Sequence, residues 1–301
     1  MTYNIVFTID KNYVQHLAVT LISLLENNQD VQFTFFVIHK NLPDNEFKTL
    51  ETITQKYGCN LKSIVIDNKI FKDLVITYHF NEVVYYRLLI PELLDLEIDK
   101  VLYLDVDIVV NGDIRDLFSY DLGTYPLASV EAVGFNRHIE LKMSHTSKYF
   151  CSGVMLLNLN IWRERKLSYK VVRFIEENPG IIKMMDQDGM NAVFDGYWLP
   201  LHPKYGQQTS FYQNEKKEVL KHFEEEDFLE AIKKPAIIHY TGSSKPWHFR
   251  NTHPYKYLYW KYLKMTPYKR YFAEDFTLLN LLKWMIPISI KKFIKSRITL
   301  V

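Results

Sequence analysis

Two aspartates beside an apolar run are the residues of this chain that most clearly predict chemistry. Val101–Leu104 leads into Asp105, Val106 and Asp107, and Ile108–Val110 follows. Side chains alternate along a strand, so we expect Asp105 and Asp107 to project to the same side. Two carboxylates that close disfavour each other's ionisation unless a cation lies between them. Oxygen ligands suit Mg²⁺ or Mn²⁺ holding a phosphate, so the pair predicts metal-assisted chemistry on a phosphorylated substrate.

A histidine and a lysine much later in the chain extend this prediction. His239 ends a short apolar run and precedes Gly242 and Lys245. Neutral imidazole is a good ligand for Mn²⁺-like ions, and two carboxylates with one imidazole leave positions for substrate oxygens. Gly242 lets the backbone approach a phosphate closely, and Lys245 supplies a mobile positive charge. The plainer alternative is a structural histidine at the end of a strand.

Two further groups of polar residues have both a functional and a structural interpretation. Asp186–Asp188 lies at a predicted helix start, where aspartates commonly cap free N–H groups, but where one side chain could also face a reacting centre. Asp10, Asn12 and Tyr13 follow the first predicted strand. An acid and an amide can hydrogen-bond a nucleobase edge and a tyrosine ring can stack on it, whereas the alternative is an ordinary strand-to-helix turn.

The elements that must position these residues alternate between strands and helices. Period-2 and helical patterns predict strands at 5–9, 33–38, 61–66, 127–130, 154–159 and 236–240, and helices at 14–27, 44–57, 162–177 and 186–194. Such alternation favours an α/β fold with a mostly parallel sheet flanked by helices on both faces. Ligands of these sheets gather at the carboxyl ends of the strands, where Asp10, Asp105 and Asp107 fall.

Composition favours one α/β domain with an extension, in a chain of 301 residues of which 48% are hydrophobic. We expect a catalytic domain at 1–265 and a helical basic and aromatic C-terminal extension at 266–301. Only Cys59 and Cys151 occur, which argues against a disulfide framework and fits a reducing compartment. The start of the chain shows no signal-peptide pattern.

Charge is distributed unevenly along the chain. Residues 1–241 hold 25 Lys and Arg against 33 Asp and Glu, whereas residues 242–301 hold 12 against 2. A basic end on an acidic body indicates an anionic partner, and the apolar residues mixed into 276–301 favour a membrane surface over nucleic acid. No run reaches the roughly 18 apolar residues of a membrane span. We therefore expect a cytoplasmic protein peripheral to the inner face of the cell membrane; a solubilising tail and a helix docked on the protein itself are the alternatives.

Six motifs in order make the chain resemble glycosyltransferase family 8, the retaining GT-A enzymes that include bacterial lipopolysaccharide galactosyl- and glucosyltransferases. The resemblance runs from about Asn4 to Trp247, and it depends on residues 5–13, 86–88, 100–107, 150–154, 186–188 and 239–247. It implies a Rossmann-like GT-A fold, a UDP-glucose or UDP-galactose donor, a Mn²⁺ or Mg²⁺ ion, and transfer of the hexose with retention to a saccharide acceptor. That acceptor could be lipid- or protein-linked, in cell-surface glycan synthesis.

The resemblance also implies roles for individual residues. The metal would be held by Asp105, Asp107 and His239. The donor would be bound by Thr8, Asp10, Asn12, Tyr13, Arg87, Val106, Gly242 and Lys245. The catalytic candidates are Gln187, which would lie beneath the anomeric carbon, Asp186, which would contact the donor sugar, and Asp188, the one conceivable nucleophile for a double displacement.

Two departures and two rival functions accompany this assignment. Cys151 replaces a family asparagine, and Glu131 stands where related enzymes often have aspartate near the sugar, so both could alter donor choice. One rival is a haloacid-dehalogenase-type phosphatase, because Leu104–Val109 fits that family's Asp-x-Asp pattern with Asp105 as nucleophile. The other is a catalytically silent carbohydrate-binding or membrane scaffold protein. The sequence leaves open the acceptor, the linkage and the choice between front-face attack and double displacement.

Overall fold

The computed structural model describes residues 2–66 and 82–285, and it places the side chains of these residues up to Leu282. The elements of the first half are β1 (Thr2–Thr8), α1 (Val14–Glu26), β2 (Gln32–His39), α2 (Asp44–Gln55), β3 (Asn60–Val65), η2 (Glu82–Leu89), α3 (Ile90–Leu93), β4 (Lys100–Leu104), β5 (Ile108–Val110), α4 (Arg115–Ser119), β6 (Leu127–Glu131) and β7 (Phe150–Asn158). Those of the second half are α5 (Leu159–Glu164), α6 (Leu167–Glu177), α7 (Met185–Phe194), β8 (Leu199–Pro200), η3 (Pro203–Tyr205), β9 (Gln207–Gln208), α8 (Ser210–Gln213), α9 (Lys216–Val219), α10 (Glu225–Lys233), β10 (Ile237–His239), α11 (Lys256–Leu263) and α12 (Leu278–Met285).

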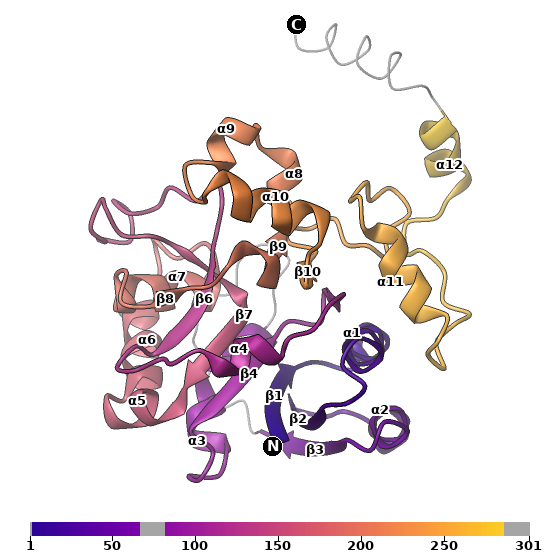
Figure 1. The fold of residues 1–301 in the computed structure, drawn as a ribbon, viewed down its shortest axis with the longest axis horizontal. Helices are drawn as coiled ribbons and strands as arrows, with labels where there is room; N and C mark the ends of the chain where they lie inside the picture. The colour runs from indigo at the N-terminus through magenta and orange to yellow at the C-terminus, as the bar shows by residue number, and fades with distance from the viewer. Residues whose placement is uncertain (1, 67–81, 286–301) are drawn as a thin grey trace, which may run out of the picture.

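A seven-stranded sheet in the order β3-β2-β1-β4-β7-β6-β8 forms the centre of the molecule (Figure 1). Strands β3, β2, β1 and β4 are parallel neighbours, β7 runs antiparallel to β4 and β6, and β8 is parallel to β6. The mostly parallel α/β sheet predicted from the sequence is therefore confirmed. Its parallel half brings the carboxyl ends of β1 and β4 to one edge, and Asp10 and Asp105 follow those ends.

Helices cover both faces of this sheet because successive side chains of its strands point in opposite directions. In β1, Ile5 and Phe7 belong to a core shared with α1 and α2. Val6, between them, belongs to a second core shared with α5, α6 and α7. Figure 1 shows these two groups of helices on opposite sides of the strands. A sheet covered in this way is a rigid support for residues at its strand ends.

The structure corrects two expectations about local elements. Asp105–Asp107 is not part of a strand: β4 ends at Leu104, the chain bends, and β5 begins a second, three-stranded sheet in the order β5-β10-β9. The predicted helix at 162–177 is two helices, α5 and α6, because Lys166 adopts the left-handed conformation at φ 52°. Apolar spacing continues across that break, which is why it was not visible as a pattern.

The C-terminal region begins by packing on the body and then leaves it. Helix α11 lies against α1, where Tyr259 Oη is 2.7 Å from His16 Nδ1 and Asn27 donates to Tyr262 Oη at 2.8 Å. Helix α12 lies apart from the body in Figure 1. Tyr268 and Tyr271 still pack against the core, so the expected boundary between 265 and 266 stays a prediction. Residues 286–301 of the expected membrane segment lie outside the described residues, and no described helix is long and apolar enough to cross a bilayer.

Candidate functional site

Strand pairing brings His239 to Asp105 and Asp107, two potential metal ligands that lie more than a hundred residues earlier in the sequence. Strand β10 runs antiparallel to β5, with His239 opposite Ile108. The register continues past β5, where the N–H of Tyr240 donates to the carbonyl of Asp107 at 3.0 Å. On the other side, the N–H of Asp105 donates to the carbonyl of Gly153 in β7 at 2.8 Å. The bend between β4 and β5 is thus fixed by two neighbouring strands.

The ligand atoms of Asp105, Asp107 and His239 lie within 4.8 Å of one another. His239 Nε2 is 3.2 Å from Asp107 Oδ1 and 3.7 Å from Asp105 Oδ2. Asp107 Oδ1 is buried, yet among the described residues it accepts no hydrogen bond of good geometry. A buried carboxylate oxygen without a donor is costly unless a cation or proton satisfies it. Two carboxylates and one imidazole therefore fit a divalent cation.

Gly153 makes room for the imidazole. A Cβ atom on Gly153 would lie 2.1 Å from His239 Cε1, a separation that real Cβ atoms do not show. Cys151, two residues earlier in β7, has its Sγ 3.6 Å from His239 Nδ1. In the tautomer that leaves Nε2 free for a cation, Nδ1 donates to this sulfur. The backbone of β7 and the thiol together fix the direction of His239.

Asp105 is held from its other side by a buried network that also reaches the catalytic candidates. Tyr103 Oη donates to Asp105 Oδ1 at 2.7 Å, and Thr8 Oγ1 lies 3.0 Å from the same hydroxyl. Arg87 bridges two carboxylates, with Nη2 3.1 Å from Asp105 Oδ1 and Nε 3.2 Å from Asp186 Oδ2. These contacts leave Asp105 Oδ2 on the side of His239.

Charges inside this network shift the protonation of its members. Burial alone would raise the pKa of Asp107, but Lys245 and His239 outweigh it and hold that pKa below its usual range. Burial lowers the pKa of His239, yet the carboxylate of Asp107 and the thiol of Cys151 raise it to about 10. Burial raises the pKa of Asp186 to about 7, against the opposing effect of Arg87. The site therefore favours a positive charge next to the buried Oδ1 of Asp107.

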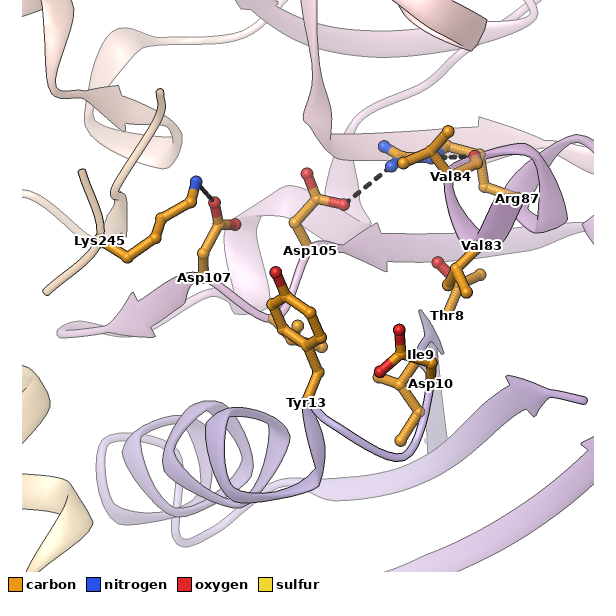
Figure 2. Close-up of a pocket in the computed structure, with 11 residues that line it drawn as sticks. Thr8, Ile9, Asp10, Tyr13, Val83, Val84, Arg87, Asp105, Asp107 and Lys245 are labelled. Atoms are coloured by element: carbon orange, nitrogen blue, oxygen red, sulfur yellow. Dashed lines mark hydrogen bonds and ion pairs between the residues drawn. The ribbon is translucent and has the colours of Figure 1, made fainter. Parts of the chain in front are cut away.

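A cavity of about 130 Å³ opens beside the carboxylates (Figure 2). Eight predicted donor-binding or metal-binding residues line it, namely Thr8, Asp10, Tyr13, Arg87, Asp105, Val106, Asp107 and Lys245. Figure 2 shows the hydroxyl of Tyr13 pointing toward the two aspartates, and Lys245 reaching Asp107 from the side away from Asp105. Asn12 is not among the lining residues, and its N–H donates to Asp10 Oδ1 at 2.7 Å.

A second cavity, of about 270 Å³, adjoins the same carboxylates. Arg87, Asp105, Asp107 and Lys245 line both cavities, so the two spaces meet at the expected metal ligands. The second cavity is also lined by Cys151, Asp186, Gln187, His239 and Gly242. Gly242 adopts φ 87°, and no described heavy atom lies within 4 Å of a Cβ built there, so its backbone is open to the cavity.

Asp188 does not line either cavity and is fully buried. Its Oδ1 accepts from Tyr149 Oη at 2.7 Å, and its Oδ2 accepts from the N–H groups of Lys183 and Met184 at 2.7 and 2.8 Å. Arg137 Nη1 adds an ion pair at 3.3 Å. Both oxygens are therefore engaged inside the protein, which gives Asp188 the geometry of a structural anchor and not that of an attacking group.

Several site residues were not selected from the sequence. Tyr103 is the clearest case, because strand alternation puts it on the side of Asp105 and could have identified it. Val84, Gly153, Gln208 and Ser210 carry no chemical signal of their own, and only the fold brings them to the cavities.

Glu131, by contrast, lies away from these cavities. Its Oε1 is 2.6 Å from His222 Nδ1 and its Oε2 is 2.9 Å from Lys148 Nζ, in a different depression. Its carboxylate is thus paired outside the two cavities, and an effect of Glu131 on donor choice stays a prediction.

Comparison with known proteins shows the family and the fold of this chain. The model of the family described as glycosyl transferase family 8 matches residues 4–251. General stress protein A of Bacillus subtilis (strain 168) is 34% identical over 87% of this chain and 93% of its own length. Lipopolysaccharide 1,2-glucosyltransferase of Escherichia coli (strain K12) is 29% identical over 88% and 79%, respectively. Among solved structures, the galactosyltransferase LgtC in complex with donor and acceptor sugar analogs shares the fold, with a TM-score of 0.80 at 23% identity over 88% of this chain and 96% of that one.

Proposed function

The chain belongs to glycosyltransferase family 8, and on that premise we propose that it transfers glucose or galactose from a UDP-sugar to a saccharide acceptor in cell-surface glycan synthesis. One observation carries the proposal: Asp105, Asp107 and His239 meet where two cavities join. One cavity is lined by groups that suit a nucleoside, and the other by Asp186 and Gln187. The family assignment leaves no role for the phosphatase alternative.

The first cavity is proposed to bind the nucleoside part of the donor. Asp10 and Thr8 offer hydrogen-bonding atoms at its wall, and the ring of Tyr13 offers a stacking face. Burial raises the pKa of Tyr13, and nearby carboxylates add to this, so its hydroxyl stays neutral and can donate toward a phosphate. Asn12 would act indirectly, because its backbone N–H donates to Asp10 and helps to orient that carboxylate.

The diphosphate would lie where the two cavities meet. A divalent cation held by Asp105, Asp107 and His239 supplies Lewis-acid stabilisation of the charge that a departing nucleoside diphosphate develops. Lys245 pairs with Asp107 and lies beside the open backbone of Gly242. Its ammonium group can therefore compensate phosphate charge directly. Manganese is proposed as the ion because the site combines imidazole with carboxylates.

The sugar would enter the second cavity, against Arg87, Asp186 and Gln187. Asp188 cannot attack the anomeric carbon without leaving its four partners, so we propose that the acceptor hydroxyl attacks on the face from which the diphosphate departs. A phosphate oxygen of the leaving group would take the hydroxyl proton. This path retains the anomeric configuration without a protein nucleophile.

The acceptor is proposed to be a glycan at the membrane. The relatives' names include lipopolysaccharide glucosyl- and galactosyltransferases. In this chain, α11 presents a depression lined by Pro254, Lys256, Tyr257, Trp260, Lys261 and Lys264. Exposed apolar side chains follow it at Phe272, Phe276, Leu278, Leu279 and Leu282. Cations beside aromatic and apolar groups suit an anionic lipid surface, which supports a protein peripheral to the inner face of the cell membrane.

A donor screen tests the proposal. The protein is incubated with UDP-glucose, UDP-galactose and other nucleotide sugars, with Mn²⁺ or with chelator, and release of the nucleotide is measured. We expect UDP release from one of the two hexose donors that stops when the metal is chelated, and an α-linked product by anomeric NMR. A β-linked product would refute retention. Binding of UDP and Mn²⁺ by calorimetry without any turnover would support the non-catalytic scaffold instead.

A further inference from the structure

A tyrosine that the mechanism above does not use lies directly behind Gln187. Tyr149 immediately precedes β7 and is 2% exposed. Its hydroxyl lies between two side chains of α7, 2.7 Å from Asp188 Oδ1 and 3.3 Å from Gln187 Nε2. Gln187 lines the second cavity, whereas Tyr149 does not. Its ring stacks on Phe135, which also lines the cavity, with centroids 5.1 Å apart, but its hydroxyl reaches the cavity through the glutamine.

The direction of each hydrogen bond in the series Gln187–Tyr149–Asp188 follows from the buried carboxylate of Asp188. A carboxylate only accepts hydrogen bonds, so the Tyr149 hydroxyl must donate to Asp188. Burial raises the pKa of Tyr149 well above its usual value, and Asp188 raises it further, which keeps the proton on the hydroxyl. The hydroxyl oxygen can then only accept from Gln187, and the group that faces it must be the amide NH₂.

This fixes the orientation of the Gln187 amide, which is ambiguous in an isolated glutamine side chain. With NH₂ toward Tyr149, Oε1 points to β7, where the N–H of Ser152 donates to it at 2.9 Å. Ser152 Oγ lies 3.3 Å from the same oxygen. Both ends of the amide are therefore satisfied in one orientation. A flipped amide would place its NH₂ against the N–H of Ser152. It would also place its oxygen against the Tyr149 hydroxyl, whose proton is already donated to Asp188.

Asp188, the last member of this series of hydrogen bonds, is held by further contacts. Besides Tyr149, Asp188 binds the N–H groups of Lys183 and Met184 and pairs with Arg137. The next residue, Met185, adopts the left-handed conformation at φ 52°, an uncommon one for a residue with a side chain. Asp188 thus holds the sharp turn from which Asp186 and Gln187 enter the cavity.

We propose that Tyr149 is a positioning residue, which together with Asp188 fixes the direction of the Gln187 amide toward the donor sugar. The inference rests on the proposed function, in which Gln187 contacts the sugar during transfer. In this inference, the role of Asp188 is to support Gln187. A fixed amide dipole stabilises charge at the reacting carbon without reorganising, whereas an amide that flips freely does not.

The test is the removal of one hydroxyl. In Tyr149→Phe, we expect kcat for donor turnover to fall roughly tenfold to hundredfold, because small misplacements of a site group have effects of that order. The KM for the UDP-hexose should stay within about twofold, because the lost interaction acts on the transition state and not on binding. Tyr262→Phe is the matched control, since Tyr262 is also 2% exposed and hydrogen-bonded, but to Asn27, the residue that follows α1. It should keep its kcat.

A double variant separates positioning from general loss of structure. If Tyr149 acts through Gln187, Tyr149→Phe should change kcat less than about twofold in a Gln187→Ala background. Full additivity of the two changes would overturn the inference, and so would an unchanged kcat in Tyr149→Phe alone.

Nuclear magnetic resonance gives a readout that does not need turnover. The side-chain amide resonance of Gln187, assigned by its loss in Gln187→Ala, should shift in Tyr149→Phe and stay in place in Tyr262→Phe. An unshifted resonance would overturn the inference even in a protein without transferase activity. An absence of turnover in the unmodified protein would instead contradict the proposed function, so the two failures are distinguishable.

Discussion

Asp107 is the residue at which most interactions of the candidate centre meet. Its side chain contacts His239 and Lys245, and its carbonyl accepts from Tyr240, so the same residue links the metal ligands to the strand that carries His239. Within the part of the chain that the structure describes, one of its carboxylate oxygens lacks a hydrogen bond of good geometry. We therefore expect function to depend more on the negative charge of Asp107 than on the shape of its side chain.

Asp107→Asn should therefore lose activity while the protein stays folded. The amide keeps the size of the side chain but removes the charge that a divalent cation and Lys245 both require. We expect a decrease in kcat/KM of about 100-fold or more, which corresponds to the several kcal/mol that a metal contributes to charge stabilisation. Nucleotide release and Mn²⁺ calorimetry measure it, with Asp113→Asn, an exposed aspartate that pairs with Arg115, as the control. Full activity of Asp107→Asn would refute the metal role.

Gly153→Ala tests the space around the imidazole. The new methyl group would overlap the His239 ring, so the ring has to move away from the two aspartates. We expect Mn²⁺ binding to weaken roughly tenfold to hundredfold, the usual effect of disturbing the support of a metal ligand. Gly180→Ala is the control, because no described atom lies within 4 Å of a Cβ at that position and its φ is not positive. Equal Mn²⁺ affinity in both variants would show that the ring does not depend on Gly153.

At the scale of elements, α1 and α11 hold the loop that carries Lys245. The ring of Trp247, two residues beyond that lysine, stacks on His16 of α1 with centroids 3.6 Å apart. Trp260 of α11 donates to the carbonyl of Pro246 at 3.0 Å. Tyr259 of the same helix lies at hydrogen-bond distance from His16. The position of Lys245 is thus set by packing between two helices from opposite ends of the chain.

This junction should make the stability of the protein sensitive to acid. Burial lowers the pKa of His16 to about 3, below its ordinary 6.5. Between these values the unfolded chain binds a proton that the folded protein does not, so the free energy of unfolding falls as the pH falls from 6.5 toward 3, by up to about 1.4 kcal/mol per pH unit. Above pH 6.5 His16 contributes no pH dependence.

Urea unfolding of the protein and of His16→Gln at several pH values measures this effect. The variant lacks the titrating ring, so the stability advantage of the unmodified protein should shrink steadily below pH 6.5. His145→Gln, at an exposed position, should leave the pH profile unchanged. A constant difference between His16→Gln and the unmodified protein from pH 7.5 to 4.5 would contradict the prediction.

For the whole molecule, the separation of charge is the feature with the widest consequence. The acidic body contains the described catalytic candidates, and the basic C-terminal region begins beside them at Lys245 and continues through α11. Figure 1 shows α11 and α12 on one side of the molecule, away from α5 and α6. An anionic surface would therefore bind the protein in a preferred orientation.

Reversal of two exposed lysines on and next to α11 tests this membrane proposal. Lys261→Glu with Lys264→Glu should weaken binding to phosphatidylglycerol vesicles tenfold or more, since each basic residue near an anionic surface contributes roughly 1 kcal/mol. Lys48→Glu with Lys56→Glu makes the same charge change on and next to α2 and should have a small effect. Vesicle flotation at low and high salt measures both pairs. Equal binding of the two pairs would show that α11 is not the contact face.

The sequence by itself determined the class of the fold and the residue types of the site. Periodicity predicted the strands that begin the sheet, and the Asp105–Asp107 and His239–Lys245 motifs predicted the metal-binding and phosphate-binding chemistry. Both signals are local, because alternation and short motifs involve residues close in the chain. The break between α5 and α6 was missed for the same reason, since a left-handed Lys166 leaves no mark on apolar spacing.

Only the tertiary structure decided which groups meet and which are already occupied. Asp188 and Gln187 are neighbours in sequence with equal chemical promise, yet one is satisfied in the interior and the other lines the cavity. The pairing of β10 with β5, which brings His239 to Asp107, joins segments more than a hundred residues apart. Such contacts depend on packing and hydrogen-bond satisfaction over the whole fold, and no property of a short stretch of sequence encodes them.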